Sequence, residues 1–190
     1  MNVLLDYGHG GTDPGAVYKG RREADDVLRL GQAVAHQLRV AGVKVAETRT
    51  KDSFLSLEQR VKIEHAKSYD LVISIHRNAF KPEAATGAEV FVYNVATSKA
   101  KPVATAIQKA FVQVGFKDRG VKQANFYVLK HTKAPALLLE VGFIDNSKDN
   151  ALFDAKFDEI VRGISHAILQ HTVAARSQSK VCASCGQIVG

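Results

Sequence analysis

The chain has 190 residues, of which 46% are hydrophobic and 24% are charged, and these proportions exclude a largely disordered protein. The net charge is +7, so we expect the surface to favour an anionic polymer such as nucleic acid, an anionic membrane or an anionic cell wall. No apolar run approaches the roughly 20 residues that span a bilayer, and the N-terminus lacks the pattern of a signal peptide. We therefore expect synthesis in the cytoplasm.

Apolar strands and amphipathic helices alternate along the chain. The expected strands are Val3–Asp6, Val43–Glu47, Leu71–His76, Ala88–Tyr93, Asn125–Leu129 and Ala136–Val141, and the expected helices are Arg22–Val40, Leu57–Ser68, Pro102–Val114 and Phe157–Leu169. This order predicts a single α/β domain whose mostly parallel, twisted sheet is flanked by helices on both faces.

From Ala174 onward Ser, Gln and Lys become frequent, which is typical of a linker. We therefore expect a main domain over 1–173 and a linker or tail over 174–190. Both cysteines, Cys182 and Cys185, lie in this tail. Their spacing supplies half of a four-ligand zinc site, and the chain contains no second pair. A core without disulfides fits synthesis in a reducing compartment.

Two histidines and two glutamates stand at informative places. His9 follows the first strand, His76 and Glu140 close later apolar runs, and Glu23 begins the first helix on its inward face. Because ligands bind at the carboxyl ends of parallel strands, we expect these side chains to meet at one rim of the sheet. Two imidazoles and a carboxylate suit a catalytic zinc ion that keeps one position open for water. His9, Glu23 and His76 are the predicted ligands, and Glu140 is the predicted base.

Each of these residues also has an ordinary interpretation. Glu23 could complement the dipole of its helix, and Glu140 could be the buried partner of an arginine such as Arg77 or Arg119. Asn78, two residues beyond His76, could either bind substrate or stabilise a turn. The convergence of the four predicted residues at one rim favours the metal site.

Several motifs in the same order resemble the zinc-dependent N-acetylmuramoyl-L-alanine amidases of the type 3 family. The motifs are Asp6–Gly11, Asp13–Ala16, Glu23, Ser74–Asn78, Gly87–Phe91 and Leu139–Phe143. The resemblance covers roughly 1–170 and makes 1–173 a catalytic amidase domain. It implies one zinc ion at His9, Glu23 and His76, with Glu140 as the catalytic carboxylate. The implied reaction cuts the amide between N-acetylmuramic acid and L-alanine of the peptidoglycan stem peptide, with a water molecule activated by zinc.

The resemblance also implies a setting for the reaction. A compact member without a signal peptide or a full wall-binding module resembles a phage endolysin, or a prophage or sporulation lysin. Endolysins are made in the cytoplasm and reach the wall after membrane permeabilisation. Peptidoglycan is then the partner, with anionic wall polymers as further candidates. One departure is Arg22, where family members often carry an asparagine before the ligand glutamate.

Other functions remain open from the residues alone. The same ligands would serve a zinc peptidase that cuts the stem peptide, or a deacetylase, and they would accept other divalent ions. A wall-binding module without catalysis would not need Glu140 beside a metal. We expect no nucleic-acid partner, because the chain has no basic helix with interleaved aromatic residues.

Overall fold

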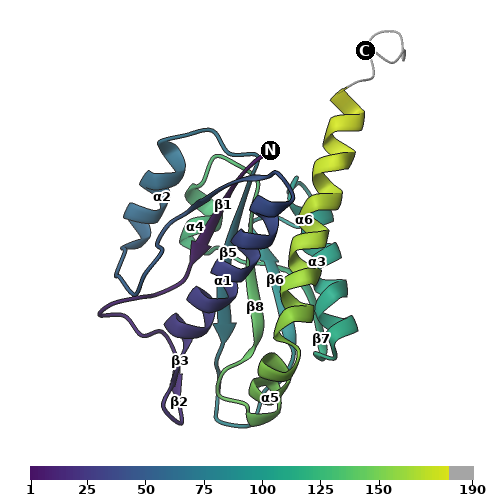
Figure 1. Cartoon of the computed structure of the whole chain (residues 1–190). Helices are drawn as coiled ribbons and strands as arrows, with labels where there is room; N and C mark the ends of the chain where they lie inside the picture. Colours follow the sequence, from purple (N-terminus) through teal and green to yellow (C-terminus); the bar gives the residue numbers. More distant parts are fainter. Residues whose placement is uncertain (180–190) are drawn as a thin grey trace.

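Six strands form the central sheet of the computed structural model, which describes residues 1–179 (Figure 1). The order across the sheet is β4-β1-β5-β8-β6-β7. The first four strands in this order run parallel, β6 runs antiparallel to β8, and β7 runs parallel to β6. The strands are β1 (Asn2–Tyr7), β4 (Lys44–Glu47), β5 (Leu71–Asn78), β6 (Ala88–Val92), β7 (Asp118–Gln123) and β8 (Ala136–Phe143). The predicted mostly parallel sheet is confirmed.

Helices cover both faces of this sheet, as predicted (Figure 1). On one face lie α1 (Glu23–Val40), α3 (Lys101–Val114) and α6 (Phe157–Ser179). On the other lie α2 (Leu57–His65) and α4 (Tyr127–His131), and the short helix α5 (Ser147–Ala155) packs against β8 and α6. A small hairpin of β2 (Val17–Tyr18) and β3 (Arg21–Arg22) leads into α1.

The alternation of side chains along the strands decides which face carries the functional residues. Ile73 and Ile75 of β5 are buried in the large core under α1, α3 and α6, whereas Val72 belongs to the smaller cluster under α2 and α4. Because successive residues of a strand point to opposite faces, His76 points to the same face as Val72. Glu140 is the register partner of His76, so it points to the same side.

The predicted strand over Asn125–Leu129 is wrong. From Tyr127 onward this segment belongs to α4, which buries the adjacent residues Val128 and Leu129 together. A strand would point neighbouring residues to opposite faces, whereas a short helix can turn both toward the sheet. The sixth strand is instead β7, whose polar sequence gives little apolar signal because it lies at the edge of the sheet.

The helix predicted over Leu57–Ser68 ends earlier, at His65. Val61 is buried, but Leu57 is 49% exposed. The other buried side chains of α2 are Arg60 and Glu64, which form hydrogen bonds across the fold. A polar buried face carries no apolar periodicity, so the pattern could not reveal it.

Helix α5 was not predicted. Helix α5 begins after Asn146, whose side chain accepts hydrogen bonds from the backbone of Lys148 and Asp149. This asparagine cap was the available signal. The final helix continues to Ser179, past the predicted linker start at Ala174. Cys182 and Cys185 lie outside the described residues. Within residues 1–179, no helix has the length and apolar character that a bilayer crossing requires.

Candidate metal centre and catalytic cleft

The structure brings His9, Glu23 and His76 together from three elements: the loop after β1, the first turn of α1 and the end of β5. One possible ligand atom of each residue lies within 4.8 Å of the others. Nε2 of His9 lies 3.1 Å from Oε2 of Glu23, and Nδ1 of His76 lies 3.0 Å from Oε1. The two imidazoles are nearly perpendicular, with centroids 5.1 Å apart. A carboxylate with an imidazole on each oxygen matches the donor set that divalent transition metals prefer.

Glu23 is held in place by the backbone as well as by the histidines. The backbone N–H of Ala16 donates to its Oε2 at 3.1 Å, and that of Arg77 donates to its Oε1 at 3.0 Å. Burial alone would raise the pKa of Glu23, but the hydrogen bonds with His76 and His9 hold its pKa far below the usual range. The carboxylate is therefore ionised and oriented between the two rings.

His9 occupies a tight turn that glycine makes possible. Its own φ is 58°, in the left-handed region that few residues other than glycine adopt. Nδ1 of His9 lies 2.8 Å from Oδ2 of Asp13, which leaves Nε2 facing Glu23. A Cβ at Gly15 would lie 2.7 Å from Oε2 of Glu23, and one at Gly8 would lie 2.2 Å from the ring of His76. Both glycines thus leave room for the three side chains.

Glu140 lies in the sheet directly beside His76 on one side and beside Glu89 of β6 on the other. Its Oε2 is buried and has no hydrogen-bond partner among the described residues. Burial raises the pKa of Glu140 well above its usual range, and the charges of Glu23 and Glu89 add to this effect. A carboxyl group with a raised pKa next to a metal-ligand cluster is typical of a general acid and base.

The arginine partners considered for Glu140 bind elsewhere. Arg77 is fully buried and donates to Asp26 at 2.6 Å, while Arg119 donates to Glu89 at 3.2 Å. Glu140 therefore forms no ion pair with either arginine, although the charge of Arg77 partly offsets the rise in its pKa.

Asn78 lies at the end of β5 with its amide groups already engaged. Its Nδ2 donates to Oε1 of Glu89 at 2.5 Å, and its Oδ1 accepts from the backbone of Ala79 at 2.9 Å. The predicted substrate contact of Asn78 stays a prediction. The observed contact instead orients Glu89, a residue that was not among the predicted site residues.

The model of the N-acetylmuramoyl-L-alanine amidase family matches residues 3–170. The chain belongs to this family. The resemblance read from the motifs is therefore confirmed, and so is the predicted activity as an amidase that acts on peptidoglycan.

Individual relatives agree with this assignment. The amidase LytC of Bacillus subtilis (strain 168) is 37% identical over 151 residues, which are 77% of this chain and 30% of LytC. The endolysin of Bacillus phage SPP1 is 36% identical over 178 residues, which are 88% of this chain and 65% of the endolysin. The chain thus spans less than two thirds of either protein.

A solved structure supports the same fold. The catalytic domain of the amidase CwlV from Bacillus (Paenibacillus) polymyxa var. colistinus superposes with a TM-score of 0.84 at 34% identity, over 90% of this chain and 98% of that domain. The architecture described above is therefore that of an amidase catalytic domain.

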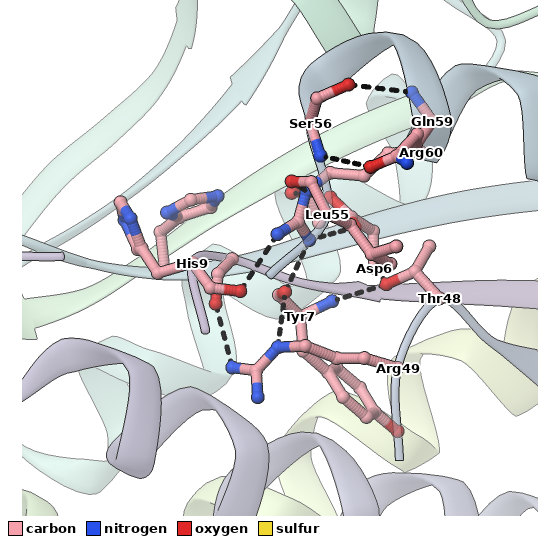
Figure 2. A network of polar contacts seen from close by, with 12 residues as sticks. Asp6, Tyr7, His9, Thr48, Arg49, Leu55, Ser56, Gln59 and Arg60 are labelled. Atoms are coloured by element: carbon pink, nitrogen blue, oxygen red, sulfur yellow. Dashed lines mark hydrogen bonds and ion pairs between the residues drawn. The ribbon is translucent and has the colours of Figure 1, made fainter. Parts of the chain in front are cut away.

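Two buried arginines of the amidase fix the loop that carries His9 (Figure 2). Arg60 donates to the backbone oxygens of Tyr7 at 2.5 Å and of His9 at 2.8 Å. Arg49 donates to the oxygens of Tyr7 at 3.1 Å and of Gly8 at 2.8 Å. Sequence reasoning missed both residues, because isolated arginines carry no spacing pattern. They determine the path of the backbone on which the position of His9 depends.

The same network buries an aspartate. Asp6 is 2% exposed and accepts hydrogen bonds from Arg60 at 2.8 Å, from Thr48 at 2.9 Å and from Ser74 at 2.7 Å. Burial alone would raise the pKa of Asp6, but the charge of Arg60 and the hydrogen bonds from Ser74 and Arg60 lower it. Its carboxylate is ionised and paired inside the fold.

Arg60→Met should destabilise the amidase by about 3–5 kcal/mol, because it leaves the buried Asp6 carboxylate without its cation. Denaturant unfolding near neutral pH measures this loss. Since the folded pKa of Asp6 is depressed, the stabilisation is complete above the usual value of 3.8 and is lost as the pH falls below it. The difference in the free energy of unfolding between wild type and Arg60→Met should therefore become smaller in acid. Lys156→Met, which breaks an exposed pair with Glu159, should cost less than about 1 kcal/mol; equal losses would contradict the assigned role.

Two hollows flank the candidate centre. One, of about 330 Å³, is lined by His9 and His76 together with aromatic side chains that include Phe54, Phe126 and Tyr127. The other, of about 420 Å³, lies beyond Glu140 at the start of β6 and β7. A larger hollow of about 650 Å³ lies between α1 and α6 on the opposite side of the sheet, and none of the candidate site residues line it. The substrate of the amidase therefore has room on both sides of the centre.

Proposed function

We propose that the amidase hydrolyses the bond between N-acetylmuramic acid and L-alanine in peptidoglycan with one zinc ion held by His9, Glu23 and His76. The observation that carries this proposal is an ionised carboxylate between two imidazoles, with the unpaired carboxyl of Glu140 on the neighbouring strand. The names of the family and of LytC support the choice of bond.

The residues present fit zinc. Two nitrogen donors and one oxygen donor are a common set for catalytic zinc, and the ligand atoms lie close enough to share one ion. The hydrogen bond of His9 with Asp13 orients the ring, as carboxylates commonly do for histidine ligands. The same set would accept other divalent ions, which element analysis distinguishes from zinc. When bound, zinc would lower the pKa of water and polarise the acyl carbonyl.

Glu140 supplies the proton transfers. In its ionised form it takes a proton from the attacking water, and it then delivers this proton to the alanine nitrogen as the amide bond breaks. Burial and the charges of Glu23 and Glu89 raise the pKa of Glu140, which makes its ionised form a stronger base. The buried backbone around β5 and β8 holds this group rigidly beside the ligand cluster.

Metal removal should abolish hydrolysis of purified peptidoglycan, and stoichiometric zinc should restore it. Mass analysis of the digest should find peptides with a new alanine amino terminus and intact glycan chains. Element analysis of the same protein should find about one ion per chain. Activity that survives complete removal of the metal would refute the metal site. Release of acetate would indicate a deacetylase, and cleavage within the stem peptide would indicate a peptidase.

The biological setting stays a prediction. Relatives include the amidase LytC of a bacterium and an endolysin of a phage, and their names support a role on the cell wall. The net charge of +7 would favour an anionic wall in either case.

A further inference from the structure

We propose that Arg119 forms a subsite for a carboxylate of the stem peptide on the leaving-group side of the scissile amide. This inference rests on the proposed function and adds the chemical group that the amidase recognises beyond the bond it cuts. The subsite is the hollow of about 420 Å³ beside β6 and β7, which Arg119, Lys117 and Phe143 help to line.

The guanidinium of Arg119 is held in a defined orientation. Its Nε donates to Oε2 of Glu89 at 3.2 Å, and its Cζ stacks 4.8 Å from the centre of the Phe143 ring. Its terminal nitrogens have no partner among residues 1–179, although the side chain is only 30% exposed. Two terminal N–H groups on a fixed plane form the fork that binds a carboxylate in a bidentate manner.

The side chains that line the hollow carry more positive than negative charge. Glu89 already pairs with Lys122 and accepts a hydrogen bond from Asn78, so its charge is compensated without Arg119. Lys117 also lines the hollow, and no acidic side chain lining it except Glu89 offsets these cations. An anionic group of the substrate would therefore gain both a pairing partner and a favourable local potential.

The position of the hollow relative to Glu140 indicates which part of the substrate enters it. Glu140 delivers its proton to the leaving nitrogen, so the peptide must pass close to this residue. Glu89 is the register partner of Glu140 on the next strand, and Arg119 binds Glu89 from the strand beyond. A peptide leaving across β6 thus reaches the guanidinium.

The distances agree with a carboxylate near the second residue of the peptide. Two strand spacings place β7 about 10 Å from β8. Two extended residues span about 7 Å, and the arginine side chain covers the remainder. In peptidoglycan the residue after L-alanine is a glutamate joined through its side chain, which leaves its α-carboxyl group free or, in some walls, converted to a carboxamide. This carboxylate is the proposed ligand of Arg119.

The test compares two muramoyl peptides that differ only in whether this group is a carboxylate or a carboxamide. Wild-type amidase should prefer the carboxylate about tenfold or more in kcat/KM, because a charge-assisted hydrogen bond is replaced by a neutral one. Arg119→Gln should abolish this preference mainly through a higher KM for the carboxylate, and Arg119→Lys should restore part of it.

Lys122→Gln is the matched control. Lys122 also pairs with Glu89 but does not line the hollow, so its loss should reduce the preference far less than the loss of Arg119 does. Equal loss of preference in Lys122→Gln and Arg119→Gln would show that Arg119 acts only through Glu89, and would overturn the subsite. Equal kcat/KM values of the wild type for the two peptides would by themselves overturn the proposed subsite. Failure of the proposed function is a different outcome, since wild type would then cleave neither peptide.

Discussion

Glu140→Gln should lower the turnover of the amidase by about 10²–10⁴-fold while the bound metal content stays that of wild type. Glutamine keeps the size and polarity of the side chain but can no longer accept and return a proton. The predicted ligands His9, Glu23 and His76 are left intact, so metal binding gives an independent readout. Single-turnover kinetics and element analysis on the same preparation measure the two effects.

The stability of this variant separates a catalytic role from a structural one. Oε2 of Glu140 is buried and makes no hydrogen bond with the described residues, so the fold gains little from the charge. We expect Glu140→Gln to unfold at the same temperature as wild type or higher, a pattern that is common where function is maintained at the expense of stability. The control is Glu159→Gln on α6, an exposed carboxylate whose loss should leave turnover intact. Wild-type turnover in Glu140→Gln would exclude this residue as the proton carrier.

His76→Ala should remove both the metal and the activity. The variant leaves one imidazole and one carboxylate, which are too few protein ligands for a catalytic zinc site. Loss of a group that merely orients a ligand weakens metal affinity by about 10–100-fold, so loss of the ligand itself should exceed this range. Competition with a chromogenic chelator measures the affinity, and the peptidoglycan assay measures the activity.

A histidine elsewhere in the fold provides the comparison. His36 is exposed on α1, the helix that also carries Glu23, and it lies outside the candidate ligand set. His36→Ala should bind metal as wild type does. If His76→Ala retains a full equivalent of tightly bound zinc, the ion is bound elsewhere and the proposed centre is wrong.

Much of this arrangement followed from local patterns. The helical spacing of Val27, Leu30, Val34 and Leu38 predicted both α1 and the inward position of Glu23, and all four are fully buried. Apolar runs that end in His76 and Glu140 predicted two parallel strands, which lie next to each other in register. These patterns were sufficient because burial of one helix stripe, or of both faces of a strand, leaves its mark on adjacent residues.

Contacts between distant segments left no such mark. Arg49 and Arg60 lie 42 and 53 residues beyond Tyr7, whose backbone oxygen both of them bind. A strand was predicted where α4 lies, because a short helix can bury a few neighbouring apolar residues. β7 was not predicted, because an edge strand can be polar. The orientation of the Asn78 side chain likewise depends on its hydrogen bond with Glu89, which comes from another strand of the sheet.

The amino-acid pattern was thus enough for the fold class, the family and the candidate metal ligands, because each depends on short motifs and on the periodic burial of apolar residues. The spatial packing alone decided that Glu140 lacks an arginine partner, that two guanidinium groups hold the His9 loop, and that Arg119 faces a hollow. Pairing between charged side chains depends on distances that only the folded backbone sets, and many pairings are compatible with one linear order.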